Sequence, residues 1–356
     1  MTPSGKSYKK IVIKVGSSLF CSKSGEFEAA ALNKLVKQLS GLANDSKVKF
    51  VIVSSGAIAL GMLQLKLSFR PRELSVLQAA AAIGQNILMD SYSKAFKGQN
   101  IAQILLTWDD FNDRNRYLNA KKTLDTLLEL NCIQIVNEND TVSIDEIKFG
   151  DNDRLSALVA TMISADLLII LSDVDGLLDK DKKLIKVVEE INSQIKALAS
   201  PSEKKTSVGG MITKIEAAKI SVDSGIPCVI ASGHAENIIC RIASDPFSRG
   251  TWTVFAPQKG LTERDRWIAF GTKPKGKIIV DDGAKKALLN CKSLLSVGIT
   301  GVEGNFEDGS VVSVMDKSGC EFARGKVSVS SKIIDEVKGQ HFAREIIHRD
   351  NIVILN

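Results

Sequence analysis

The 356-residue sequence lacks the features that mark secreted, metal-binding or membrane proteins. Its six cysteines occur singly, without a C-x-x-C pair, so neither a disulfide framework nor a zinc site is predicted. Its three histidines show no metal-ligand spacing. No apolar run approaches the roughly 18 residues needed to cross a membrane, and Lys9, Lys10 and Lys14 interrupt the N-terminal apolar run. These absences predict a cytoplasmic protein of a reducing compartment, without membrane contact.

The sequence instead contains alternating strand-like and helix-like segments up to about residue 255. Hydrophobic residues make up 44% of the chain, enough for sizeable cores, and its length predicts two domains. Strands are predicted at 11–15, 48–53, 101–106, 132–136, 167–171 and 226–230, and the clearest helices at 29–42, 73–96, 111–131 and 211–224. This alternation predicts an α/β fold, an open and mostly parallel sheet sandwiched by helices, in which ligands bind at the carboxyl ends of the strands.

Two polar clusters lie ten residues apart in the middle of this region. The run 137–140 (Asn-Glu-Asn-Asp) follows a predicted buried strand, and the run 150–153 (Gly-Asp-Asn-Asp) precedes a helix predicted at 154–163. Either cluster alone is typical of a turn or a helix cap. Together they crowd like charges, which destabilises a fold. The pair therefore predicts a site for a ligand carrying an ammonium and carboxylates, or for cations.

Two lysines indicate phosphate chemistry at the same sheet. Lys14 interrupts an apolar strand just before Gly16, and Lys214 lies one turn inside a helix preceded by Gly209 and Gly210. Small-residue turns and helix N-termini expose backbone N–H groups that bind phosphate oxygens. Phosphoryl transfer depends on positive charge around the moving group. Lys14 is the stronger candidate, since lysines are also common on surfaces.

These motifs resemble the amino acid kinase family, specifically its glutamate-phosphorylating branch. The matching segments follow one another in the family's order: 13–18, 53–59, 114–120, 136–140, 150–153 and 209–214. The resemblance implies ATP-dependent phosphorylation of the side-chain carboxylate of L-glutamate, the first step of proline biosynthesis. It also implies ATP as a substrate, with Mg²⁺ held mainly by the phosphates and no dedicated protein site for the metal.

The resemblance also assigns roles to residues. Lys14 and Lys214 would stabilise the transferring phosphoryl group, and Asp151 would hold both lysines. The residues implied in glutamate binding are Ser55, Asp140, Asn152 and Asp153. Those implied in ATP binding are Lys14, Ser172, Asp173, Val208, Gly209, Gly210, Met211, Ile212, Thr213 and Lys214. The chain departs from the family's pattern at Leu178, Ser207 and Val208, which makes the nucleotide side the place where affinity is expected to differ.

Other acceptors remain open within the same fold, among them aspartate, acetylglutamate, carbamate and UMP. The acidic residues Asp140 and Asp153 favour a substrate with a free ammonium, because an acylated amine offers no charge to pair with them. Proline is an expected feedback inhibitor, with the loop 141–149 as the expected moving part. The family resemblance further predicts a homo-oligomer, dimer or tetramer, and a glutamyl phosphate reductase as a possible partner.

The C-terminal part has a different pattern. The kinase domain is predicted at 1–257, a linker at 258–275 and a β-rich domain at 276–356, with strands near 277–280, 311–315, 320–328 and 351–355. This segment resembles a PUA domain, which makes RNA binding or regulation the alternative function. Residues 275–356 carry 12 Lys and Arg against 11 Asp and Glu, a net charge of +1 out of +6 for the chain. The lack of concentrated basic charge disfavours RNA as a partner.

Overall fold

The computed structural model describes residues 8–21, 27–43, 48–143, 152–199, 210–257 and 261–355. The chain divides into two compact units. The first takes in the described residues up to Asp110 and those of Asn115–Gly260, and the second takes in those of Phe111–Arg114 and Leu261–Asn356. Several predicted positions lie outside the described residues: Asp151, Ser207, Val208, Gly209 and the loop 144–149.

The first unit is built on an eight-stranded sheet, in the order β3-β4-β2-β1-β5-β7-β8-β6. Its strands are β1 (Lys10–Val15), β2 (Lys49–Ser54), β3 (Ile101–Leu106), β4 (Ile133–Glu138), β5 (Leu167–Ser172), β6 (Val187–Val188), β7 (Cys228–Ser232) and β8 (Trp252–Phe255). The six strands from β3 to β7 in this order run parallel, and β8 pairs antiparallel with β7. The predicted α/β fold with a mostly parallel sheet is confirmed, and all six predicted strands are present.

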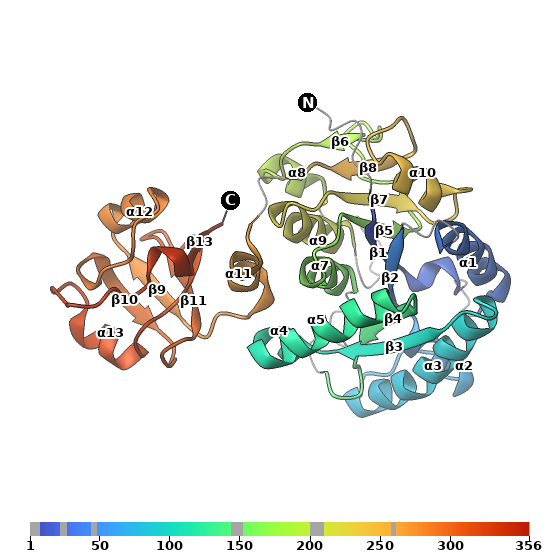
Figure 1. Ribbon diagram of the computed structural model, residues 1–356, viewed down its shortest axis with the longest axis horizontal. Helices are drawn as coiled ribbons and strands as arrows, with labels where there is room; N and C mark the ends of the chain where they lie inside the picture. The colour runs from blue at the N-terminus through green and yellow to red at the C-terminus, as the bar shows by residue number, and fades with distance from the viewer. Residues whose placement is uncertain are drawn as a thin grey trace. The chain divides into compact units, whose positions relative to one another are not determined.

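Helices cover both faces of this sheet (Figure 1). The main ones are α1 (Ala29–Ala43), α2 (Ala57–Gln64), α3 (Leu74–Ala95), α5 (Arg114–Glu129), α7 (Asn152–Met162), α9 (Met211–Asp223) and α10 (Ile238–Ser244), with the shorter α4 (Trp108–Asn112) and α8 (Ser193–Leu198) between them. One core joins α1, α3 and α10 to one face, whereas α7 and α9 pack together on the other. None of the described helices is long and apolar enough to cross a membrane.

The alternation of side chains along β1 explains which face of the sheet Lys14 lies on, near the carboxyl end of the strand. Ile11, Ile13 and Val15 are fully buried in the core with α1, α3 and α10. Because side chains alternate between the two faces of a strand, Val12 and Lys14 face the opposite layer, where α7 packs on β1. The strand's own periodicity therefore directs Lys14 toward the start of α7.

One predicted helix is divided in two. The pattern predicts a helix over 111–131, but α4 begins at Trp108 and α5 follows from Arg114 to Glu129. The backbone N–H and the hydroxyl of Thr107 both donate to Asp110 Oδ2, at 2.6 and 2.9 Å. This capping starts a helix ahead of the apolar pattern that the prediction followed.

The second unit contains a five-stranded sheet in the order β10-β9-β11-β12-β13. Its strands are β9 (Lys277–Val280), β10 (Ile299–Glu303), β11 (Val311–Met315), β12 (Glu321–Lys326) and β13 (Ile352–Ile354), and its helices are α11 (Glu263–Arg266), α12 (Asp282–Leu289) and α13 (Ser331–Val337), with a π-helical turn η2 (Trp267–Gly271). The β-rich fold is confirmed, although β10 was not predicted. Part of the predicted linker is structured, because Ile268 and Ala269 of η2 are buried against Val311 and Val353.

Two glycines allow close contact between α2 and α3. A Cβ atom at Gly61 would lie 1.7 Å from the carbonyl oxygen of Ala80, and one at Gly84 would lie 1.7 Å from that of Ala57. Neither neighbour is the end of a flexible side chain, so an added methyl group would force the helix backbones apart. The glycines thus set the spacing of a helix pair that leads directly out of β2.

We expect Gly84→Ala to lower the free energy of unfolding by about 3 kcal/mol, the upper range for an overpacked interior. Urea unfolding measures the change. Gly41→Ala is the matched control, because Gly41 is also helical and its added Cβ would meet only Cys240 Sγ, at 3.6 Å. That variant should be neutral or up to about 1 kcal/mol more stable, owing to helix propensity. Equal effects of the two substitutions would contradict the close-contact explanation.

Candidate active site

The carboxyl ends of neighbouring strands bring four sequence segments together. Val15 of β1 pairs with Ser54 of β2 and with Leu171 of β5, and Val53 pairs with Val136 of β4. The residues that follow these pairs therefore lie along one edge of the sheet, as the fold class predicts. They are Gly16, Ser55, Asn137 and Ser172.

At this edge a buried carboxylate joins the two lysines. Asp153, the second residue of α7, has an exposed side-chain fraction of 1%. Its Oδ1 lies 2.6 Å from Lys14 Nζ and its Oδ2 lies 3.2 Å from Lys214 Nζ. The Thr213 hydroxyl also donates to Oδ2, at 2.9 Å. Residues 14 and 214, 200 positions apart in the sequence, thus meet on one carboxylate.

The charges of this cluster determine the protonation state of Asp153. Burial alone would raise the pKa of its carboxyl, but Lys14 and Lys214 outweigh burial and hold that pKa below its ordinary value. Asp153 is therefore ionised at neutral pH. Two ammonium groups and one carboxylate leave a net charge of +1 in a buried position, next to the N-terminus of α9, where a helix also presents positive potential.

The structure gives Asp153 the contacts that the sequence interpretation expected of Asp151. Asp151 itself lies outside the described residues. Asp153 was expected among the glutamate-binding residues, yet both of its oxygens are engaged by Lys14, Lys214 and Thr213. These contacts make it a residue that holds the lysines.

A second group of contacts surrounds Asn152, the first residue of α7. Its amide nitrogen lies 3.0 Å from the Ser54 carbonyl oxygen, 3.0 Å from Ser55 Oγ and 2.8 Å from Asn137 Oδ1. Ser55 and Asn152, two of the predicted glutamate-binding residues, are thereby in direct contact. Asn137 in turn donates to Gln85 Oε1 of α3, at 2.9 Å.

No role was assigned to Gln85 from the sequence, although its position on the predicted buried face of a helix indicated a polar contact. The buried positions of α3 recur with helical spacing, and Gln85 occupies one of them among alanines, glycine and leucine. A glutamine on the buried face of a helix requires polar partners. Periodicity alone identified this face as core and gave no indication that its partner would be an asparagine of β4.

Asp140 lies in the turn after β4 and is partly buried. Burial raises the pKa of its carboxyl to about 6 from an ordinary value of 3.8, against the opposing effect of Arg70. The raised pKa means that the surroundings disfavour the ionised form of this carboxyl. A nearby cation would offset the free-energy cost of ionisation. The binding of a substrate ammonium by Asp140 stays a prediction from the sequence.

The predicted nucleotide side includes the end of β5 and the start of α9. The Ser172 hydroxyl donates to Asp173 Oδ1 at 3.0 Å, and the Ser172 carbonyl accepts from Gly233 N–H at 2.9 Å. Gly210 is the N-cap of α9, and its added Cβ would meet nothing within 4 Å. Leu178 is 44% exposed.

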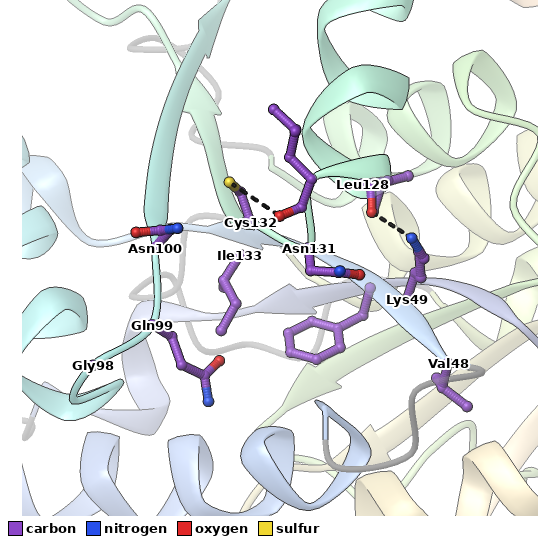
Figure 2. A pocket seen from close by; sticks show the side chains of 11 residues that line it. Val48, Lys49, Gly98, Gln99, Asn100, Leu128, Asn131, Cys132 and Ile133 are labelled. Carbon is purple, nitrogen blue, oxygen red and sulfur yellow. Dashed lines mark hydrogen bonds between the residues drawn. The ribbon is translucent and has the colours of Figure 1, made fainter.

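A cavity of about 480 Å³ lies away from all of these residues (Figure 2). It is lined by residues at the starts of β2, β3 and β4 and the end of α5: Val48, Lys49, Phe50, Gly98, Gln99, Asn100, Leu128, Leu130, Asn131, Cys132 and Ile133. This is the amino edge of the parallel strands, whereas the charged and amide clusters lie at the carboxyl edge. Lys49 Nζ donates to the Leu128 carbonyl there, at 2.6 Å. None of the predicted site residues lines the cavity.

Comparison with known proteins shows the family of the chain. The family model described as "Amino acid kinase family" matches residues 9–232, and the PUA domain model matches residues 276–349. The chain belongs to the amino acid kinase family, with a PUA domain after the kinase part.

Its relatives match along nearly the whole chain. The glutamate 5-kinase of Caldanaerobacter subterraneus subsp. tengcongensis is 44% identical, covering 97% of this chain and 98% of its own length. That of Dictyoglomus turgidum is also 44% identical, covering 98% of each chain. Among solved structures, carbamate kinase from Giardia lamblia bound to AMP-PNP matches with a TM-score of 0.50 and 18% identity, covering 70% of this chain and 99% of that one. This last likeness concerns the fold alone.

The raised pKa of Asp140 predicts a stability that depends on pH. The native carboxyl binds its proton more tightly than the unfolded one, so the ionised group destabilises the fold fully above about pH 6 and hardly below about pH 4. We expect Asp140→Asn to raise the free energy of unfolding at pH 8 by about 1 to 3 kcal/mol and to change it little at pH 4.

Urea unfolding at the two pH values measures this difference. Asp90→Asn, on the exposed surface of α3, is the control and should change the free energy of unfolding by less than about 0.5 kcal/mol at either pH. A stabilisation by Asp140→Asn that is the same at pH 4 and pH 8 would contradict the electrostatic explanation.

Proposed function

We propose that this protein is a kinase that transfers the γ-phosphoryl group of ATP to the side-chain carboxylate of L-glutamate, forming L-glutamyl 5-phosphate and ADP. The observation that carries the proposal is the Asp153 carboxylate between Lys14 and Lys214. The glutamate 5-kinases that match nearly the whole chain support the choice of substrate. The product makes this the first step of proline biosynthesis.

The reaction requires little covalent work from the protein. A carboxylate oxygen of glutamate attacks the γ-phosphorus in line, and the bond to the β–γ bridging oxygen breaks, so that ADP leaves with that oxygen. The acceptor carboxylate is already ionised at neutral pH and needs no general base. Catalysis then rests on bringing two anionic reactants together and on stabilising the charge that spreads over the phosphoryl oxygens.

Lys14 and Lys214 supply that stabilisation, and Asp153 positions them. Without the carboxylate, two ammonium groups buried this close would repel each other. With it, their orientation is fixed before the substrate arrives, which is the condition for effective electrostatic catalysis. The α9 N-terminus, where the predicted ATP-binding run ends, adds backbone N–H groups facing the same region.

The glutamate half of the site is proposed to consist of Ser55, Asn152 and Asp140. Asp140 is placed to pair with the substrate ammonium, because burial disfavours its ionised form in the absence of a cation. The Ser55 hydroxyl and the Asn152 carboxamide, 3.0 Å apart, offer further neutral hydrogen bonds to the same amino acid.

The ATP half is proposed to include Ser172, Asp173 and the run up to Lys214, with Mg²⁺ on the phosphates. Within the part of the chain that the structure describes, no three His, Cys, Asp or Glu side chains are grouped to hold a metal ion. The acidic residue nearest the lysines, Asp153, is already paired. Mg²⁺ keeps water and phosphate oxygens as ligands, and the proposal therefore places it on the phosphates of ATP.

Regulation and assembly stay predictions. Proline is proposed to inhibit at the glutamate site, and an unchanged rate with millimolar proline at limiting glutamate would exclude this. A homo-oligomer, a cytoplasmic location and transfer of the acyl phosphate to a reductase rest on the family resemblance. RNA binding by the C-terminal domain is not favoured, given the net charge of +1 carried by residues 275–356.

The substrate assignment predicts acyl phosphate formation from glutamate alone. With ATP and Mg²⁺ present and hydroxylamine as the trapping reagent, glutamate should give the hydroxamate, whereas aspartate, acetylglutamate and a reaction without acceptor should not. Lys214→Ala should lower kcat by about 10²-fold or more, since it removes a charge that acts on the transferring group.

Lys10→Met is the matched control for this variant. Lys10 lies on the same strand as Lys14 but at its amino end, where its Nζ bonds the Ile163 carbonyl at 2.8 Å. Its kcat should stay within about threefold of the wild-type value. Activity on another acceptor would reassign the substrate, and full activity of Lys214→Ala would refute the role of the lysine pair.

A further inference from the structure

Three carboxamide side chains form a continuous hydrogen-bonded chain beneath the glutamate side of the site. Asn137 Nδ2 donates to Gln85 Oε1 at 2.9 Å, and Asn152 Nδ2 donates to Asn137 Oδ1 at 2.8 Å. The three residues come from α3, β4 and α7, and their exposed fractions are 9, 2 and 6%. Gln85 lies outside every sequence motif of the active site, 52 positions before Asn137.

Backbone groups fix the direction of this chain. The Glu138 N–H, which can only donate, points to Asn137 Oδ1 at 2.9 Å. The Ser54 carbonyl, which can only accept, receives Asn152 Nδ2 at 3.0 Å. These two contacts determine which end of each asparagine carboxamide is oxygen and which is nitrogen. Asn137 Nδ2 must then face α3, and Gln85 Oε1 provides its acceptor.

The fixed direction leaves one acceptor open. With its nitrogen turned to Ser54, Ser55 and Asn137, the Asn152 side chain has its Oδ1 buried and without a hydrogen-bond partner in the described structure. A buried acceptor without a partner costs about 1 to 3 kcal/mol, and a ligand that supplied the donor would remove that cost. Asn152 bonds the Ser55 hydroxyl on one side and is followed by Asp153, the residue that holds the lysines.

We propose that Gln85 is a positioning residue for the amino acid substrate. By accepting from Asn137 it keeps Asn137 Oδ1 directed at Asn152, and it thereby keeps Asn152 Oδ1 as the acceptor for the ammonium group of the substrate. Loss of the Gln85 acceptor leaves the Asn137 amide nitrogen without its partner, so that only the Glu138 N–H still orients this carboxamide. An Asn137 that turned would present a donor to the donor of Asn152. This inference rests on the proposed function and adds a residue of α3 to the machinery of that reaction.

The test compares steady-state kinetics with glutamate and ATP varied separately. Gln85→Met keeps the length of the side chain and removes its acceptor. We expect the KM for glutamate to rise about tenfold, the equivalent of one hydrogen bond. The KM for ATP should stay within about twofold and kcat within about threefold. Gln85→Glu, which retains an acceptor oxygen, should restore most of the loss in KM for glutamate.

Gln134→Met is the matched control. Gln134 is a fully buried glutamine of β4, three residues before Asn137, whose Nε2 donates to the Leu124 carbonyl at 3.0 Å and whose Oε1 has no hydrogen-bond partner in the described structure. It therefore takes no part in the amide chain. Its replacement should lower Tm and leave both KM values unchanged. If Gln85→Met does not fold, Gln85→Ala removes the same acceptor without adding bulk and replaces it in the comparison.

The outcomes separate this inference from the proposed function. A wild-type protein that does not phosphorylate glutamate overturns the function. A wild-type protein active on glutamate, with an unchanged KM for glutamate in Gln85→Met, overturns the role of Gln85 alone. The role of Gln85 is also overturned if Gln85→Met and Gln134→Met shift the KM values for glutamate and ATP by the same factors, because such a result indicates general structural damage.

Discussion

The site depends on one buried carboxylate that neutralises one of two buried lysines. Taking two ammonium groups out of water so close together is costly, and their mutual repulsion adds to that cost. Asp153 offsets both, and the cluster keeps a net positive charge for an anionic group. The contacts that allow Lys14 and Lys214 to be buried also orient them, so that in the proposed mechanism stability and catalysis share a single interaction.

The fold brings the two lysines and the carboxylate together through the alternation of side chains along β1 and through the first turns of α7 and α9. Lys14 occupies the face of β1 opposite to Ile13, and α7 and α9 pack together on that face. Asp153 and Lys214 both lie within the first turn of their helices, so the packing of α7 against α9 brings their side chains together. The neighbouring residue Asn152 extends the arrangement toward the glutamate side, because its amide bonds the ends of β2 and β4.

The sequence predicted the sheet and the candidate residues better than the contacts between them. Continuous apolar runs identified all six parallel strands, because strands that are buried on both faces of a parallel sheet consist almost entirely of apolar residues. The cluster 150–153 was identified as a site, but its sequence alone does not show which carboxylate contacts the lysines, and the start of α7 at Asn152 places Asp153 against both. Gln85 was missed because helical periodicity marks burial and does not identify a polar partner on a distant strand. Strand β10 was missed because Thr300 and Gly301 interrupt its apolar pattern.

The most direct test of this account is a kinetic double-mutant cycle between Asp153 and Lys214. Asp153→Asn, Lys214→Ala and the double variant are compared with the wild type by kcat for glutamyl phosphate formation. If Asp153 acts by holding the lysines, Asn at position 153 should cost about 10²-fold in the wild-type background and much less once Lys214 is gone. Losses that multiply in the double variant would mean that Asp153 acts independently of Lys214, and would contradict the account.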